Sequence, residues 1–216
     1  MMKFDPETLA NTTPLDFWQD RYTQSASRER ERGRAGTLLQ QKVAALAPGR
    51  VLELGCSTGD DSLWLAEQGW QVTGVDISPA AVETAQRLAA EAGLADRTHF
   101  QALDLCEALP AGQFQLITGL YFQSPFPDFP RERILRELAQ QLEIGGHLLL
   151  VTHGSRPPWT DHGPETYPTP EEEYAALGIS GPAWKVCEVS ACERPAKTPA
   201  GEQVTLTDNV ILLQRL

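Results

Sequence analysis

The stretch VLELGCSTGDD at residues 51–61 decides the fold of this chain. It opens with a short apolar run, which predicts a buried strand, and it leads into a helix predicted over residues 61–68. Gly55 and Gly59 lie between the two, and glycines in a turn let a ligand approach the backbone closely. The stretch therefore predicts a strand–loop–helix unit whose loop can bind a ligand.

The same alternation extends outward from this unit. A helical spacing of apolar residues precedes it over 36–47. Further strands are predicted at 71–75, 98–103, 114–118 and 147–152, and further helices at 79–92 and 130–142. Strands that alternate with helices in this way predict an α/β fold, with a parallel, doubly wound sheet that carries helices on both faces.

The pattern changes after the strand that ends at residue 152. Prolines dominate residues 153–170, which predicts a long loop, and a short helix is predicted at 170–177. Strands predicted at 184–191 and 204–213 are separated by a turn-rich segment. We therefore expect an antiparallel hairpin to close the chain.

A length of 216 residues favours a single globular unit. We expect a helical cap at residues 1–47, followed by the main domain at 48–216. The mixed-charge run at 28–34 is typical of a solvated linker or helix face, with an anion site as the alternative. The N-terminus lacks the apolar segment of a signal peptide. No stretch approaches the ~18–20 apolar residues that a membrane span needs.

Composition narrows the classes of partner. Lys and Arg number 18 against 29 Asp and Glu, which gives a net charge of −11. This charge repels nucleic acids and anionic membrane surfaces, so we expect a small-molecule partner and a monomer or homodimer. The four cysteines show no Cys-x-x-Cys spacing, which favours free thiols, a cytoplasmic location and no metal site.

The glycine loop does not match the common phosphate-binding motifs. A dinucleotide fingerprint needs glycine where Ser57 and Asp60 stand, and the lysine of a P-loop is missing. Glu53 and Asp61 add negative charge, and residues 51–86 contain no Lys or Arg. Because like charges repel, the loop disfavours a pyrophosphate and favours a cationic ligand.

Two further acids follow the next two predicted strands. Asp76 ends the second strand, 21 positions after Gly55, where a carboxylate can accept hydrogen bonds from two ribose hydroxyls. Asp104 follows the third strand and can accept from an adenine amino group. Acids at three successive strand ends suit an adenosine that carries a positive charge, and S-adenosylmethionine fits this description.

Residues 48–153 resemble the class I S-adenosylmethionine-dependent methyltransferases. The resemblance rests on the Glu-x-Gly-x-x-x-Gly loop that starts at Glu53, on Asp76 and Asp104, and on the fourth strand that precedes a loop. Residues 59–66, residues 70–76 and an aromatic cluster at 17–22 are similar to the tellurite-resistance and thiopurine methyltransferase branches.

The resemblance implies a Rossmann-like, seven-stranded sheet whose last strand is antiparallel. It also implies in-line methyl transfer to a small molecule. Ser57 stands where the family usually has the middle glycine of Gly-x-Gly-x-Gly, and a serine can occupy this turn if its φ is negative. The expected cofactor-binding residues are Glu53, Gly55, Cys56, Ser57, Gly59, Asp76, Ile77, Asp104, Leu105, Gly119, Trp18 and Tyr22. Cys56 is interpreted as a small residue packed under the ligand. Trp18 and Tyr22 either cover the cofactor or pack the N-terminal helix.

The acceptor should bind at the carboxyl ends of the fourth and fifth strands. The aromatic, proline-stiffened segment 119–130 can wall an apolar pocket, or it can simply pack on the following helix. His153 directly follows the fifth strand, so it is the candidate general base, with a structural role as the alternative. The candidate substrate residues are Tyr121, Phe122, Phe126, Arg156 and Arg194; the two arginines are included by analogy with the tellurite branch, to hold an anionic acceptor.

Two other functions stay open at this point. A protein or macrocyclic precursor can serve as the methyl acceptor. Alternatively, the chain is a non-catalytic S-adenosylmethionine sensor or scaffold. Phe122, Phe126 or Trp159 filling the acceptor pocket would favour that second alternative.

Overall fold

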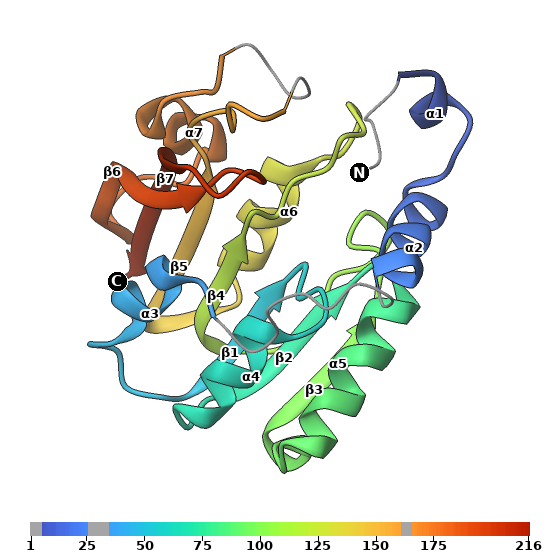
Figure 1. The fold of residues 1–216 in the computed structure, drawn as a ribbon. Helices are drawn as coiled ribbons and strands as arrows, with labels where there is room; N and C mark the ends of the chain where they lie inside the picture. The colour runs from blue at the N-terminus through green and yellow to red at the C-terminus, as the bar shows by residue number, and fades with distance from the viewer. Residues whose placement is uncertain (1–5, 26–34, 161–165) are drawn as a thin grey trace.

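Seven strands form one mixed sheet in the order β3-β2-β1-β4-β5-β7-β6. A computed structural model describes residues 6–25, 35–160 and 166–216 of the chain (Figure 1). The strands are β1 (Arg50–Leu54), β2 (Gln71–Asp76), β3 (Thr98–Ala102), β4 (Phe114–Leu120), β5 (Leu142–His153), β6 (Trp184–Lys197) and β7 (Gln203–Arg215). The mixed-charge run at 28–34 lies outside the described residues.

The first five strands run parallel, so their carboxyl ends meet along one edge of the sheet. β7 is antiparallel to both of its neighbours, β5 and β6. The predicted α/β class, the doubly wound sheet and the antiparallel last strand are therefore confirmed. Because ligands of open α/β sheets bind at the carboxyl edge, this topology fixes where a site is to be sought.

Helices cover both faces of the sheet (Figure 1). They are α1 (Pro6–Ala10), α2 (Pro14–Ser25), α3 (Thr37–Val43), α4 (Asp60–Glu67), α5 (Pro79–Glu91), α6 (Arg131–Ala139) and α7 (Pro170–Leu177), with a short 3₁₀ helix at Ala95–Arg97. The side chains of β1 alternate between the faces: Leu52 and Leu54 pack with α6 and α7, whereas Val51 packs with α3 and α4. This alternation is the period of two expected of a strand.

Two boundaries differ from the sequence prediction. α6 ends at Ala139 and β5 begins at Leu142, whereas we expected a helix to residue 142 and a strand from 147. Leu142 pairs with Phe114 before the register shifts, and pairing resumes between His147 and Leu116. Gly145, at a φ of +86°, lies inside this irregular part of β5, so the Gly145-Gly146 pair marks a bend in a strand and not the end of a helix.

The closing hairpin is longer than expected. β6 and β7 cover 184–197 and 203–215, compared with predicted strands at 184–191 and 204–213. Pro195 lies within β6 and lacks an N–H group, but β6 is an edge strand, where one side of the backbone has no partner strand.

All four cysteines are free thiols.

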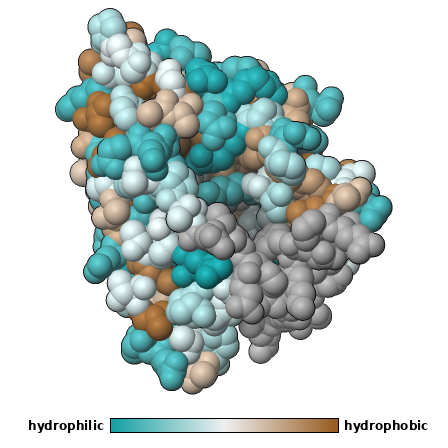
Figure 2. Space-filling model, turned by 90° about the horizontal axis from the view of Figure 1, so that it is seen from above, coloured by the Kyte–Doolittle hydropathy of each residue, from teal (hydrophilic) through white to brown (hydrophobic). Residues whose placement is uncertain are grey.

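The hydropathy of the surface and of the helices bears on contact with membranes. Seen from above, hydrophilic and hydrophobic residues are mixed over the described part of the surface and do not gather in one apolar patch (Figure 2). Within residues 6–25, 35–160 and 166–216, no helix has the length and apolar character that a membrane span requires.

Leu116 should be a main source of stability, because it lies in the middle of β4 and has no exposed surface. Leu116→Ala should lower the free energy of unfolding by about 3 kcal/mol, through lost burial and the cavity left behind. Urea unfolding followed by circular dichroism measures this. Ile144→Ala is the control, since Ile144 is 82% exposed, and should change the stability by less than ~0.5 kcal/mol. Equal effects of the two substitutions would contradict this packing.

Candidate functional site

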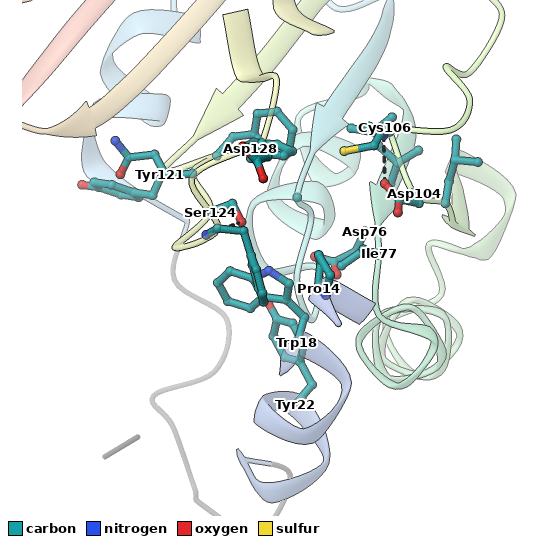
Figure 3. A pocket seen from close by; sticks show the side chains of 18 of the residues that line it. Pro14, Trp18, Tyr22, Asp76, Ile77, Asp104, Cys106, Tyr121, Ser124 and Asp128 are labelled. Carbon is teal, nitrogen blue, oxygen red and sulfur yellow. Dashed lines mark hydrogen bonds between the residues drawn. The ribbon is translucent and has the colours of Figure 1, made fainter. Parts of the chain in front are cut away.

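A cavity of about 370 Å³ opens at the carboxyl ends of β1 to β4. Helix α2 borders it on one side and the segment 121–129 on another (Figure 3). In Figure 3, Tyr121, Ser124 and Asp128 lie across the cavity from Asp76 and Ile77. The cavity thus joins the strand ends expected to hold a cofactor to the loop expected to hold an acceptor.

Many of the predicted site residues line this cavity. They are Trp18, Tyr22, Gly55, Asp76, Ile77, Asp104, Leu105, Tyr121, Phe122 and Phe126. The other predicted residues do not line it: Glu53, Cys56, Ser57, Gly59, Gly119, His153, Arg156 and Arg194. Sequence reasoning did not single out Pro14, Cys106 and Asp128, which do line it.

The turn after β1 has a different backbone from the one we expected. Ser57 occupies the turn with a φ of +53°, so the condition of a negative φ is not met. The left-handed conformation costs a non-glycine residue roughly 1–2 kcal/mol. In this conformation the Ser57 N–H donates to Asp76 Oδ2 at 3.0 Å. A hydrogen bond to a charged group contributes about 1.5–3 kcal/mol, which offsets the strain.

Asp76 is the centre of this arrangement. Its Oδ1 accepts from the Ser78 N–H at 2.9 Å, while Oδ2 accepts from Ser57. Burial raises the pKa of Asp76, although these backbone hydrogen bonds oppose the rise. A carboxylate has about four lone-pair sites, so both oxygens can accept further bonds from the cavity. Asp76 therefore fits the expected role of binding two vicinal hydroxyls.

Helix α2 is held by hydrogen bonds to the start of α5, close to Asp76. Gln19 Oε1 accepts from Ser78 Oγ at 2.8 Å and from the Ala80 N–H at 3.1 Å, at the first turn of α5. This contact joins residues 59 to 61 positions apart, so local sequence patterns carry no signal for it. It brings Trp18 and Tyr22, whose rings stack with centroids 6.4 Å apart, to the cavity. The two aromatic residues therefore border the cavity as well as packing on each other.

Glu53, in β1, and Cys56, in the glycine loop, are both buried and do not line the cavity. Glu53 is 3% exposed and accepts from Ser62 Oγ in α4. Burial, and next the charge of Asp61, raise the pKa of Glu53 well above its usual range. Burial likewise raises the pKa of the Cys56 thiol, so Cys56 is a packed, protonated thiol. Both residues are therefore part of the buried interior around the loop.

The charge of the cavity is one-sided. Asp76, Asp104 and Asp128 line it, and no Lys or Arg occurs among the described residues of the lining. Aromatic faces such as that of Trp18 also attract cations. Three carboxylates and aromatic rings fit a ligand that joins an adenosine to a positively charged sulfur.

The loop after β4 forms the remaining wall. Phe122 lies over the glycine loop, and its Cδ2 would be 3.2 Å from a Cβ built on Gly55. The ring of Phe126 meets that of Phe17 in α2 edge-on at 5.6 Å. Arg131 Nε, in α6, donates to the Phe122 carbonyl at 2.9 Å. The loop thus does both things that the sequence left open: it contacts α6, and it lines the cavity.

His153 and Arg194 lie beside the cavity, behind Tyr121. The His153 ring stacks on Tyr121, with centroids 4.4 Å apart. Arg194 Nε donates to the carboxylate of Asp208, which is fully buried. Arg156 is exposed. The guanidinium of Arg194 is therefore already paired with a carboxylate of this chain.

A family model described as a methyltransferase domain matches residues 51–146. Over these residues the chain is similar to the methyltransferase domain family. The matched residues extend from β1 into β5 and include the glycine loop, Asp76 and Asp104. S-adenosylmethionine is the cofactor that this match indicates for residues 51–146.

Curated proteins share sequence similarity with part of this chain. The "Probable tocopherol O-methyltransferase, chloroplastic" of Oryza sativa subsp. japonica is 36% identical over 107 residues, which are 49% of this chain and 29% of that protein. The chain spans half or less of the length of the curated relatives it matches.

Two solved structures resemble the fold of the whole chain. One comes from work on the conversion of a disulfide bond into a thioacetal group during echinomycin biosynthesis: TM-score 0.70, 19% identity, covering 93% of this chain and 92% of that one. The other is TehB from Haemophilus influenzae: TM-score 0.68, 17% identity, covering 92% of this chain and 67% of that one. At these identities the likeness concerns the fold alone, so membership of the tellurite-resistance branch stays a prediction.

Buried Glu53 should make the stability depend on pH. Because its pKa is raised in the folded protein, Glu53 contributes stability at low pH that is lost as the pH rises through the folded-state pKa. Glu53→Gln removes this dependence. The stability of the variant, relative to the native protein, should therefore be higher at pH 7 than at pH 5. Urea unfolding at both values measures it, with Glu67→Gln, an exposed position of α4, as the control. An equal difference at the two pH values would contradict the raised pKa.

Proposed function

We propose that the protein transfers the methyl group of S-adenosylmethionine to a neutral, largely apolar small molecule bound in the 370 Å³ cavity. One observation carries the proposal: a single cavity is lined both by the acids at the ends of β2 and β3 and by the aromatic loop after β4. Donor and acceptor can therefore lie in contact, as an in-line displacement requires.

The chain's own residues suit the binding of the cofactor. Asp76 would accept hydrogen bonds from the ribose hydroxyls, and Asp104 from the adenine amino group. Gly55 allows the close approach of the amino-acid part, and Trp18 and Tyr22 would cover the bound molecule. When bound, S-adenosylmethionine supplies a methyl group on a positively charged sulfur, which is a good leaving group.

The acceptor side is apolar and acidic, which supports a neutral acceptor over an anionic one. Phe122, Phe126 and Phe129 line it, and they would exclude water from the reacting atoms. Arg194 is paired with buried Asp208 and Arg156 is exposed, so neither presents a free cation to the cavity. The proposal therefore drops the two arginines as acceptor-binding residues.

A non-catalytic S-adenosylmethionine sensor is the second candidate, because the Phe122 ring lies against Gly55 and takes part of the space above the glycine loop. Incubation of the purified protein with a metabolite extract and an isotope-labelled methyl donor distinguishes the two. A labelled small molecule, absent when Asp76→Ala replaces the native protein, is expected. Binding of the cofactor without any labelled product would favour the sensor.

Replacing Asp76 by Ala should weaken binding of S-adenosylhomocysteine. The loss of hydrogen bonds to a charged acceptor should cost about 1.5–3 kcal/mol, which corresponds to roughly ten- to a hundredfold in the dissociation constant. Titration calorimetry measures the affinity. Asp96→Ala, an exposed acid in the 3₁₀ helix, is the control and should bind normally. Unchanged affinity in Asp76→Ala would mean that Asp76 only anchors the turn. A native protein that binds NAD but not S-adenosylhomocysteine would refute the proposal.

His153→Gln tests the proposed general base. If the acceptor must lose a proton, this substitution should lower single-turnover methyl transfer by about 10²–10⁴-fold. Affinity for S-adenosylhomocysteine should stay within twofold, since His153 does not line the cavity. The substrate is the acceptor found in the labelling experiment. A loss of less than tenfold would leave His153 with a structural role and a site that works by alignment alone.

A further inference from the structure

Asp208 in β7 is a buried carboxylate with one oxygen left unsatisfied. It has no exposed surface. Its Oδ2 accepts from Tyr121 OH at 2.9 Å and from Arg194 Nε. Its Oδ1 has no hydrogen-bond partner within residues 6–25, 35–160 and 166–216. A buried carboxylate oxygen without a hydrogen-bond donor is energetically unfavourable, so a donor close to Oδ1 would stabilise it.

His153 is the group placed to supply that donor. Its Nδ1 lies 3.8 Å from Asp208 Oδ1, because the two residues are paired across β5 and β7. This distance exceeds a hydrogen bond, so the ring must turn toward Oδ1 before Nδ1 can donate to it. The side chain of His153 remains 39% exposed, so it still has an open side.

Tyr121 connects this pair to the cavity. It follows β4 directly, with a φ of +53°, and its N–H donates to the Val151 carbonyl at 2.7 Å. Its hydroxyl is held by Asp208 and its ring stacks on His153. A strained backbone conformation persists only where surrounding contacts hold it in place. Such strained residues are typical of functional sites. Tyr121 also lines the cavity, whereas His153 lies behind it, so the stacked rings link His153 to the wall of the cavity.

We propose that Asp208 is a positioning residue that holds His153 with its Nδ1–H toward Oδ1, leaving Nε2 to take a proton from a hydroxyl or thiol acceptor. The proposal rests on the proposed function and names the acceptor class. The acceptor atom gives its proton to Nε2 and forms a bond to the methyl carbon. The bond from that carbon to sulfur breaks, and its electron pair stays on sulfur. The positive charge passes from sulfur to the imidazole, next to the carboxylate of Asp208.

The charges of the cluster agree with this role. Burial acts to raise the pKa of Asp208, but the nearby His153 ring, the hydrogen bond from Tyr121 and the charge of Arg194 outweigh it and lower the pKa. Asp208 therefore stays ionised. Burial, and next the charge of Asp208, raise the pKa of Tyr121, so its phenol stays a hydrogen-bond donor. The negative charge of Asp208 balances the positive charge of Arg194. A protonated His153 would therefore not face an unbalanced positive charge of Arg194.

The tautomer of His153 tests the proposal without cofactor or acceptor. We would record multiple-bond ¹H–¹⁵N spectra of the imidazoles at about pH 8.5, well above the ordinary histidine pKa of ~6.5. His153→Gln identifies the His153 signals. The native protein should show the Nδ1–H tautomer, and Asp208→Asn, of nearly equal size, should lose that preference. Glu193→Gln, an exposed acid of β6 paired with Thr207, should keep it.

Several outcomes would overturn the proposal. A native His153 in the Nε2–H tautomer does so without any variant, which matters if Asp208→Asn fails to fold. An unchanged tautomer in a folded Asp208→Asn protein does the same. In turnover with the identified acceptor, Asp208→Asn should add no loss to that of His153→Gln, whereas additive losses would show that the two act separately.

The failure of the proposed function would look different. Asp208→Asn should bind S-adenosylhomocysteine within twofold of the native protein. If the native protein does not bind S-adenosylhomocysteine at all, the methyltransferase proposal fails, while the tautomer of His153 still reports whether Asp208 positions it.

Discussion

The carboxylate of Asp76 holds the ends of β1 and β2 in a fixed relation. Through its two oxygens it fastens the Ser57 turn and the start of α5, and that start in turn carries Gln19 and helix α2. The glycine loop, the strand end and the aromatic helix above them are thus oriented by one side chain. Because this side chain also faces the cavity, the groups that hold the fold at this edge and the groups that would meet a ligand are the same.

Alternating strands and helices could be read from the sequence because each element carries its own periodicity. The doubly wound sheet, the glycine loop and the spaced acids Asp76 and Asp104 are local patterns of this kind. The predicted boundaries were wrong where glycines are compatible with two structures. Gly145 and Gly146 indicate a helix end in the sequence, but in the structure they bend β5. Only the pairing of Leu142 with Phe114 distinguishes the two, and that pairing is not local.

Contacts between residues far apart in the sequence account for the parts of the site that were missed. Ser57 takes a positive φ because its N–H bonds to a carboxylate 19 positions away. Tyr121, His153, Arg194 and Asp208 come from four strand ends or interiors, and nothing in the sequence around Asp208 marks it as their common partner. The sequence predicted roles for Tyr121, His153 and Arg194 but for no acid beside them, and the pairing of β7 with β5 and β6 places Asp208 among them.

The outer strand β6 has a consequence for the behaviour of the protein at high concentration. An unpaired strand edge is a template on which another chain can add, and proteins commonly block it with proline and charged residues. Pro195 within β6 and the neighbouring Glu193, Arg194 and Lys197 provide both devices. A second molecule laid along this edge would meet a strand that contains a proline and charges of both signs. The longest free edge of the sheet is therefore built to discourage the strand-by-strand growth that leads to fibres.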